Sequence, residues 1–233
     1  MVKMAFMFVI ICFLQAKDGT LLVNENFNLK ELQAPKALIS AISRHDDGNG
    51  GKCISLDTSK IYFPLIDYFR YKSGSIEFRI NYQEEPQALN DTSLVLLKAS
   101  GNYKKKYPDS YLNSFSLIQG WKAGLFLLFG DSEKRYTIRC TEAQKWKKNE
   151  WHHMAITWNI ANDGQAEIIL FADGVPSGKI NSPVKIDEES WQAVNSYEGD
   201  KINYCLAIGN FYGKVIPVLL DDLKIWDFPR LYQ

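Results

Sequence analysis

The chain has 233 residues, of which 46% are hydrophobic, and its 27 basic and 27 acidic residues give a formal net charge of zero at pH 7. A chain this close to neutral lacks the excess of positive charge that proteins use to hold nucleic acid, so we exclude a nucleic-acid partner. The 13 Phe, 12 Tyr and 6 Trp residues are typical of extensive β-sheet rather than of helix.

Residues 1–16 have the three parts of a secretory signal peptide. Lys3 gives a basic start, an apolar run extends from Met4 to Leu14, and the small Ala16 precedes polar residues. The run is far below the roughly 18 apolar residues that a spanning helix needs, and no later run is long enough. We therefore predict cleavage after Ala16, no membrane span, and a protein that is secreted or at the cell surface, or periplasmic in a Gram-negative source.

Alternation of apolar and polar residues recurs along the chain and predicts half-buried strands. The clearest case is residues 76–82, where Glu77, Arg79 and Asn81 face one side. The other strands that this pattern predicts are residues 53–56, 93–97, 114–118, 125–129, 136–140, 152–158, 167–171, 205–208 and 219–226. No linker, internal repeat or amphipathic helix of normal length interrupts them. We therefore predict an all-β, antiparallel β-sandwich jelly roll that forms one domain over residues 17–233.

Segments along this region resemble, in the same order, the conserved strands of the laminin-G-like family. They are residues 74–80, 149–158, 170–174, 207–210 and 220–226. The resemblance extends from about residue 53 to residue 228, and it implies a concanavalin-A-like sandwich with residues 20–27 as its first strand. Binding modules and glycan-degrading enzymes share that fold.

A second resemblance is to pentraxins, through residues 153–159 and 225–228. Ala155 stands where the pentraxin signature has Cys, and Asn159 stands where it has Ser or Thr. No acidic cluster matches the pentraxin calcium loop. The kinship in fold therefore carries over, whereas calcium and phosphocholine binding do not.

The acidic residues do not form the pair that glycoside hydrolases of this fold use, in which carboxylates at alternate positions of one strand face the sugar together. Glu77 is followed on its face by Arg79 and Asn81. The neighbours His152 and His153 point to opposite faces of their strand and are unsuited to binding one ion. We therefore predict no catalytic residues and no metal ligands, with His153 in a structural, hydrogen-bonded role.

The turn at residues 46–49 has two interpretations, a calcium-binding loop and a hairpin turn. Residues 46–49 follow His45 and have the oxygen-bearing side chains of a calcium loop, so calcium is possible. A Gly-rich hairpin turn explains the same residues more simply, and we prefer it.

Three cysteines remain after cleavage, namely Cys53, Cys140 and Cys205. They allow three disulfide pairings with one thiol left over. The alternative is that all three are small buried apolar residues.

Exposed aromatic residues, most of them in two long connections at residues 101–113 and 187–204, are the candidates for stacking on sugar rings. The candidates are Tyr103, Tyr107, Tyr111 and Trp121, with Trp191 and Tyr197 in the later connection. Core packing is the alternative for each, and it is strongest for Trp121. We assign Trp146, Trp151, Trp158 and Trp226 to the core.

Asp221 has a structural role on this interpretation. If Leu219, Leu223 and Ile225 face the core, alternation places Asp221 on the same side. Its carboxylate then needs donors, which we expect from backbone N–H groups of a neighbouring loop or from the ring of His153.

The sequence thus predicts an exported, non-catalytic binding module that recognises a glycan or a cell-surface or extracellular protein through its loops. The alternatives are a polysaccharide-degrading hydrolase or lyase and a structural or adhesive surface protein.

Overall fold

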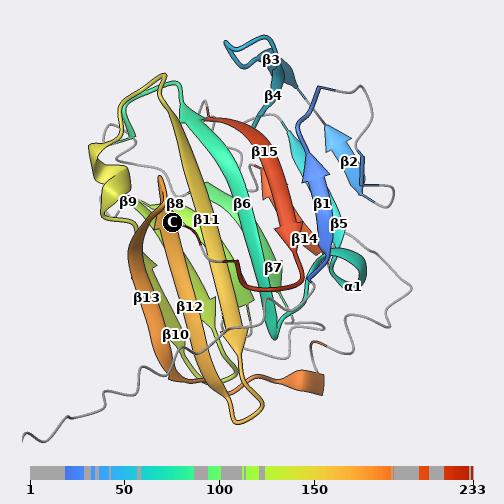
Figure 1. Cartoon of the computed structure of the whole chain (residues 1–233), viewed down its shortest axis with the longest axis vertical. Coiled ribbons are helices and arrows are strands. Elements are labelled where there is room, and N and C mark those ends of the chain that lie inside the picture. The colour runs from blue at the N-terminus through green and yellow to red at the C-terminus, as the bar shows by residue number, and fades with distance from the viewer. Residues whose placement is uncertain are drawn as a thin grey trace, which may run out of the picture.

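The computed structural model describes residues 19–28, 33–34, 37–41, 43–56, 59–86, 94–100, 112, 114–120, 124–189, 191, 205–209, 218–230 and 232. These residues form two packed antiparallel sheets, so the predicted all-β sandwich is confirmed (Figure 1). No helix within this part of the chain is long and apolar enough to cross a membrane.

The first sheet has eight strands in the order β13-β12-β11-β6-β15-β4-β3, and β1 also pairs with β15. Its strands are β1 (Leu21–Glu25), β3 (Arg44–Asp46), β4 (Lys52–Ser55), β6 (Ser73–Tyr82), β11 (Trp151–Ile160), β12 (Gln165–Ala172), β13 (Val175–Pro183) and β15 (Val218–Trp226). Strand β6 lies between β11 and β15, which come from distant parts of the chain. This crossover, rather than a simple meander, gives the sheet its jelly-roll character.

The second sheet has seven strands in the order β10-β9-β8-β7-β14-β5-β2. Its strands are β2 (Leu38–Ala41), β5 (Lys60–Pro64), β7 (Leu94–Ser100), β8 (Ser114–Gly120), β9 (Gly124–Gly130), β10 (Arg135–Arg139) and β14 (Cys205–Gly209). The described structure also includes the short helix α1 (Leu65–Tyr68) and the 3-10 helix η3 (Glu142–Lys145).

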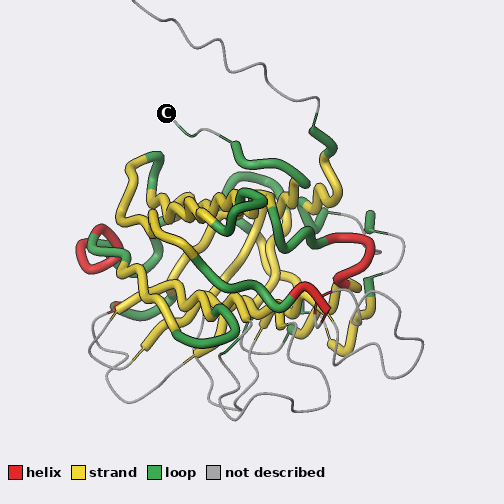
Figure 2. Tube along the Cα trace, turned by 90° about the horizontal axis from the view of Figure 1, so that it is seen from below, coloured by secondary structure: helices red, strands yellow, loops and turns green. Residues whose placement is uncertain are grey.

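The core lies between the two layers, which Figure 2 shows edge on. Alternation along β6 sends Ile76, Phe78 and Ile80 inward, and each is at most 1% exposed. Leu117 and Leu127 meet them from the second sheet and are fully buried. Each such side chain contributes about 1.5–3 kcal/mol when it leaves water.

One close approach in the first sheet requires glycine. Gly74 pairs with Trp158 across β6 and β11. A Cβ atom at Gly74 would lie 2.3 Å from the Trp158 ring, which is closer than carbon atoms approach. The indole is therefore able to pack flat in the core, where it stacks on Phe69 with ring centroids 5.1 Å apart.

Candidate functional site

The outer face of the second sheet, the face turned away from the core, is the candidate ligand surface. Strand pairing aligns one row of side chains across six strands of this face. The row consists of Tyr62, Ala207, Lys98, Ser116, Leu128 and Thr137. Their neighbours along each strand are core residues, so alternation fixes the row on the outside.

The charged residues in the strands of this sheet are all basic. Its seven strands contain no Asp or Glu, whereas they contain Lys60, Lys98, Arg135 and Arg139. Ser116, in the middle of the row, is 0% exposed, and its Oγ has no hydrogen-bond partner. The described strands of this sheet therefore contain cationic and hydroxyl side chains and no carboxylate, but the buried Ser116 hydroxyl is not accessible to a ligand, whereas Thr137 is exposed.

Most of the predicted sugar-stacking residues lie outside the described part of the chain, namely Tyr103, Tyr107, Tyr111, Trp121 and Tyr197. Trp191 is described and is only 5% exposed. Its ring stacks on Phe69 at 5.6 Å and on Tyr71 at 5.7 Å between centroids. Trp191 therefore packs with core aromatics, and we do not retain it as a residue that stacks on sugar.

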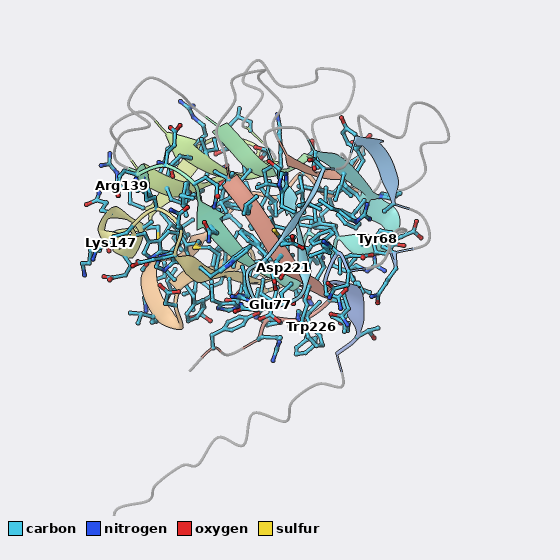
Figure 3. All side chains as sticks on the ribbon, turned by 90° about the horizontal axis from the view of Figure 1, so that it is seen from above. Tyr68, Glu77, Arg139, Lys147, Asp221 and Trp226 are labelled. Atoms are coloured by element: carbon cyan, nitrogen blue, oxygen red, sulfur yellow. The ribbon has the colours of Figure 1, made fainter. Side chains whose placement is uncertain are left out.

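The outer face of the first sheet carries a buried carboxylate, Glu77, which is labelled in Figure 3. Glu77 is 5% exposed, and its Oε1 lies 2.8 Å from Arg230 Nη1 and 3.7 Å from Lys224 Nζ. His153 Nε2 lies 3.4 Å from the other carboxylate oxygen. Burial alone would raise the pKa of Glu77, but the hydrogen bond from His153 and the charges of Arg230 and Lys224 lower it to about 2. Such a group stays ionised and is unsuited to general-acid chemistry.

Asp221 is buried at 4% exposure, but on a different face from the one predicted. The prediction placed Leu219 in the core, whereas the core residue is Leu220, and Asp221 pairs with Arg79 on the outer face. A bulge between Asp221 and Lys224, with Asp222 at φ 51°, restores Leu223 to the core. The bulge therefore reverses which positions of β15 face the core: even-numbered Leu220 before it, and odd-numbered Leu223 and Ile225 after it.

The donor to Asp221 also differs from the expected ones. Its Oδ1 accepts the backbone N–H of Asp222 at 2.8 Å, within its own strand, while His153 contacts Glu77. Burial raises the pKa of Asp221 to about 6, and the negative charge of Asp222 adds to this effect.

Asp173 organises the residues around His152. Its Oδ2 lies 2.9 Å from His152 Nδ1 and accepts a hydrogen bond from Trp146 Nε1 at 3.2 Å, while its Oδ1 accepts the backbone N–H of His153 at 2.8 Å. The His152 ring lies flat on Trp146, with centroids 4.2 Å apart. All three side chains thus serve the packing of this corner of the sandwich.

The turn predicted as a hairpin or a calcium loop joins β3 to β4, so it is a hairpin turn. Asp47 Oδ1 accepts the N–H groups of Asn49 at 2.7 Å and Gly51 at 2.9 Å. Gly48 and Gly50 have φ values of 86° and 89°, which glycine tolerates. Among the described residues, no group of three or more His, Cys, Asp or Glu side chains could hold a metal ion.

Two of the three cysteines are described in full, and both are buried free thiols. Burial raises the pKa of Cys53 to about 11, and it also raises the pKa of Cys140. The side chain of Cys205 lies outside the described part. Cys53 and Cys140 are thus the small apolar core residues of the second alternative.

The assignment of four tryptophans to the core was right for two of them. Trp146 and Trp158 are 4% and 2% exposed. Trp151 and Trp226 are half-buried on the outer face of the first sheet, and each is covered by an arginine, with Arg79 and Arg230 at 4.9 Å and 4.5 Å from the ring centroids. Apolar character alone therefore did not distinguish the two faces.

Solved structures with the same fold come from unrelated sources. The botulinum neurotoxin serotype D binding domain has a TM-score of 0.57 and 12% identity, over 90% of this chain and 48% of that one. An endo-β-1,4-glucuronan lyase from the fungus Trichoderma reesei has a TM-score of 0.55 and 10% identity, over 88% and 95%. A carbohydrate esterase from the Shiga toxin-encoding bacteriophage phi24B has a TM-score of 0.52 and 12% identity, over 90% and 99%.

These similarities establish the fold as a concanavalin-A-like jelly roll, as the laminin-G-like resemblance implied. No protein-family model matches the chain. No curated protein matches it by sequence. Because identity to the solved structures is so low, their activities are not transferred by the fold alone.

Proposed function

We propose that this protein is an exported, non-catalytic glycan-binding module whose ligand lies against the outer face of the second sheet. The observation that supports it best is the composition of that face, where the partly or fully exposed Lys98 and Thr137 lie in one row and the strands contain no Asp or Glu. Hydroxyl and ammonium groups suit the hydrogen-bonding surface of a sugar. Export rests on the signal peptide predicted over residues 1–16.

The same composition argues against hydrolysis. Glycoside hydrolases place two carboxyl groups on either side of the scissile bond, and these strands supply neither. The buried carboxyl groups of Glu77 and Asp221 lie on the outer face of the first sheet, on the other side of the core. A low pKa also keeps Glu77 from acting as a proton donor.

The test is a glycan-array screen of residues 17–233, with and without a chelator, repeated with one substitution on each sheet. Leu128→Glu places a carboxylate in the outward row, beside Ser116. Ile169→Glu makes the same kind of change at a half-buried outward position of β12, in the first sheet. We expect Leu128→Glu to abolish the glycan signal and Ile169→Glu to preserve it, with similar melting temperatures.

Three results would contradict the proposal. The first is the absence of any glycan signal, which would favour a structural or adhesive protein. The second is equal binding by both variants. The third is release of reducing or unsaturated sugar from a polysaccharide, abolished by a single Asp or Glu substitution, which would make the protein an enzyme.

A further inference from the structure

Three exposed cationic side chains lie at the edge of the sandwich, where the chain leaves the second sheet at the end of β10. They are Arg139, at the end of β10, and Lys147 and Lys148, in the segment that leads to β11. We call these three residues the basic edge. Within the described part of the chain, none of them forms an ion pair, whereas nearby Lys145 pairs with Glu142 at 2.8 Å. The basic edge therefore carries uncompensated positive charge.

The segment that carries these lysines is fixed in place. Trp146, directly before Lys147, is 4% exposed and is held by Asp173 and the ring of His152. At the two ends of the segment, Cys140 N–H donates to Leu125 O at 2.8 Å and Asn149 N–H donates to Tyr82 O at 2.7 Å. A ligand that contacts the lysines therefore meets an ordered backbone and incurs little further ordering cost.

The basic edge continues the candidate ligand surface. Arg139 pairs with Phe126 of β9, and both alternate with core residues, so the guanidinium is on the outer face of the second sheet. The hydrogen bond between Cys140 and Leu125 places the start of the lysine segment beside the same end of β9. Figure 3 shows Arg139 and Lys147 at one edge of the molecule, away from Glu77 and Asp221.

We propose that the basic edge binds the carboxylate or sulfate groups of an acidic polysaccharide that extends over the outer face of the second sheet. This inference rests on the proposed function and names its ligand class. Three separate cations are poorly matched by a neutral sugar, whereas arginine forms paired, charge-assisted hydrogen bonds with carboxylate and sulfate oxygens. Since the chain as a whole has zero net charge, the attraction comes from a local group of positive charges and is not a general affinity for polyanions.

The experiment measures binding of residues 17–233 to four probes at low and physiological salt. The probes are polyglucuronate, heparin, a neutral β-glucan and single-stranded oligothymidylate. The variants are Arg139→Glu and the double change Lys147→Glu with Lys148→Glu. Lys179→Glu is the matched control, because it reverses one exposed charge on β13 of the first sheet.

We expect Arg139→Glu to weaken binding of at least one acidic glycan by about tenfold, and the double variant to weaken it further. Lys179→Glu should change it less than twofold. Binding of the acidic glycan should also decline with salt, whereas any binding of the neutral β-glucan should be the same in all variants.

Several outcomes would overturn the inference, and they separate it from the proposed function. Preference for neutral glycan, or acidic-glycan binding that the basic-edge variants leave intact, would contradict the role of the basic edge. Either result would still agree with a glycan-binding module. Equal losses with Lys179→Glu would show a general charge effect. Oligothymidylate bound as tightly as the acidic glycans would identify a nucleic-acid partner instead. No binding of any glycan would remove both proposals.

Discussion

Arg230 Nη1 lies 2.8 Å from Glu77 Oε1 and joins the C-terminal segment to the middle strand of the first sheet, across 153 positions of sequence. The same segment is held by Ser75, whose Oγ donates to Phe228 O at 2.8 Å and accepts the Arg230 N–H at 2.7 Å. These contacts lie beyond Trp226, where β15 ends. Residues after the last strand are therefore part of the folded domain and help to cover Glu77.

We expect Arg230→Ala to lower the free energy of unfolding by about 1–3 kcal/mol, because it leaves a buried carboxylate with a missing donor. Lys224→Ala is the control, since its Nζ is farther from Glu77 Oε1, at 3.7 Å. The measurement is urea unfolding at pH 7. Equal losses for the two variants would mean that the contact of Arg230 with Glu77 contributes no more to stability than that of Lys224.

Glu77 should stabilise the fold only where it is ionised. Its folded pKa of about 2 lies below the ordinary value of 4.5, so its contribution is complete above pH 4.5 and is lost as the pH falls toward 2. Glu77→Gln should lower stability at pH 7 and flatten the stability profile between pH 4.5 and 2. Melting temperatures across that range test this, and a profile as steep as that of the unchanged protein would contradict it.

Asp173 should stabilise the fold through the several hydrogen bonds that its carboxylate accepts. We expect Asp173→Ala to destabilise the domain by about 2–3 kcal/mol, because Trp146 Nε1 and the His153 N–H lose their acceptor and alanine is disfavoured at φ 51°. Asp173→Asn keeps an oxygen acceptor and tolerates that backbone, so it should cost less. Unfolding in urea would compare them, and equal losses would show that the hydrogen bonds contribute little.

Export should remove residues 1–16, since the basic start, the short apolar run and Ala16 fit a peptidase site. N-terminal sequencing of secreted material is expected to begin at Lys17. Secreted protein that begins at Met1 or Val2 would refute the signal peptide, and with it the extracellular setting of the proposed function.

Periodicity predicted the main strands because burial on one face imposes a two-residue repeat. It missed the short strands β2, β3 and β5. It also missed β13, where Pro176, Gly178 and Pro183 break the repeat, as is common on an edge strand. It also assigned the wrong face to part of β15, since the bulge at Asp222 has a positive φ that nothing in the local sequence requires. Local patterns therefore specify strands better than they specify irregularities within strands.

The side-chain clusters were less predictable than the fold for a related reason. The Glu77 cluster joins β6, β11 and β15 to the segment after Trp226, and only the folded topology brings these together. The basic edge is divided between the end of β10 and a segment with a buried tryptophan in its middle. In the sequence Arg139 is separated from Lys147 and Lys148 by the segment that contains Trp146, so the shared exposed edge became evident only in the folded structure.

Asp221 should have the opposite pH dependence to Glu77. Its folded pKa of about 6 lies above the ordinary value of 3.8, so the folded state holds the proton more tightly than the unfolded chain. The stability that this proton gives is complete below pH 3.8 and is lost as the pH rises to 6.

Asp221→Asn should remove this loss, because the amide is neutral and its oxygen can still accept the Asp222 N–H. We expect the variant to be at least as stable as the unchanged protein at pH 7 and to have a flatter stability profile between pH 4 and 6. Asp221→Ala, which removes the acceptor as well, should instead destabilise the domain by about 1–3 kcal/mol at pH 4. Asp222→Asn is the control, because its side chain is 42% exposed and the change leaves the Asp221 carboxyl in place, so the loss of stability with rising pH should remain. Chemical unfolding at pH 4, 5, 6 and 7 distinguishes the three variants. A profile for Asp221→Asn that is as steep as before would show that burial at the bulge does not hold the proton on Asp221.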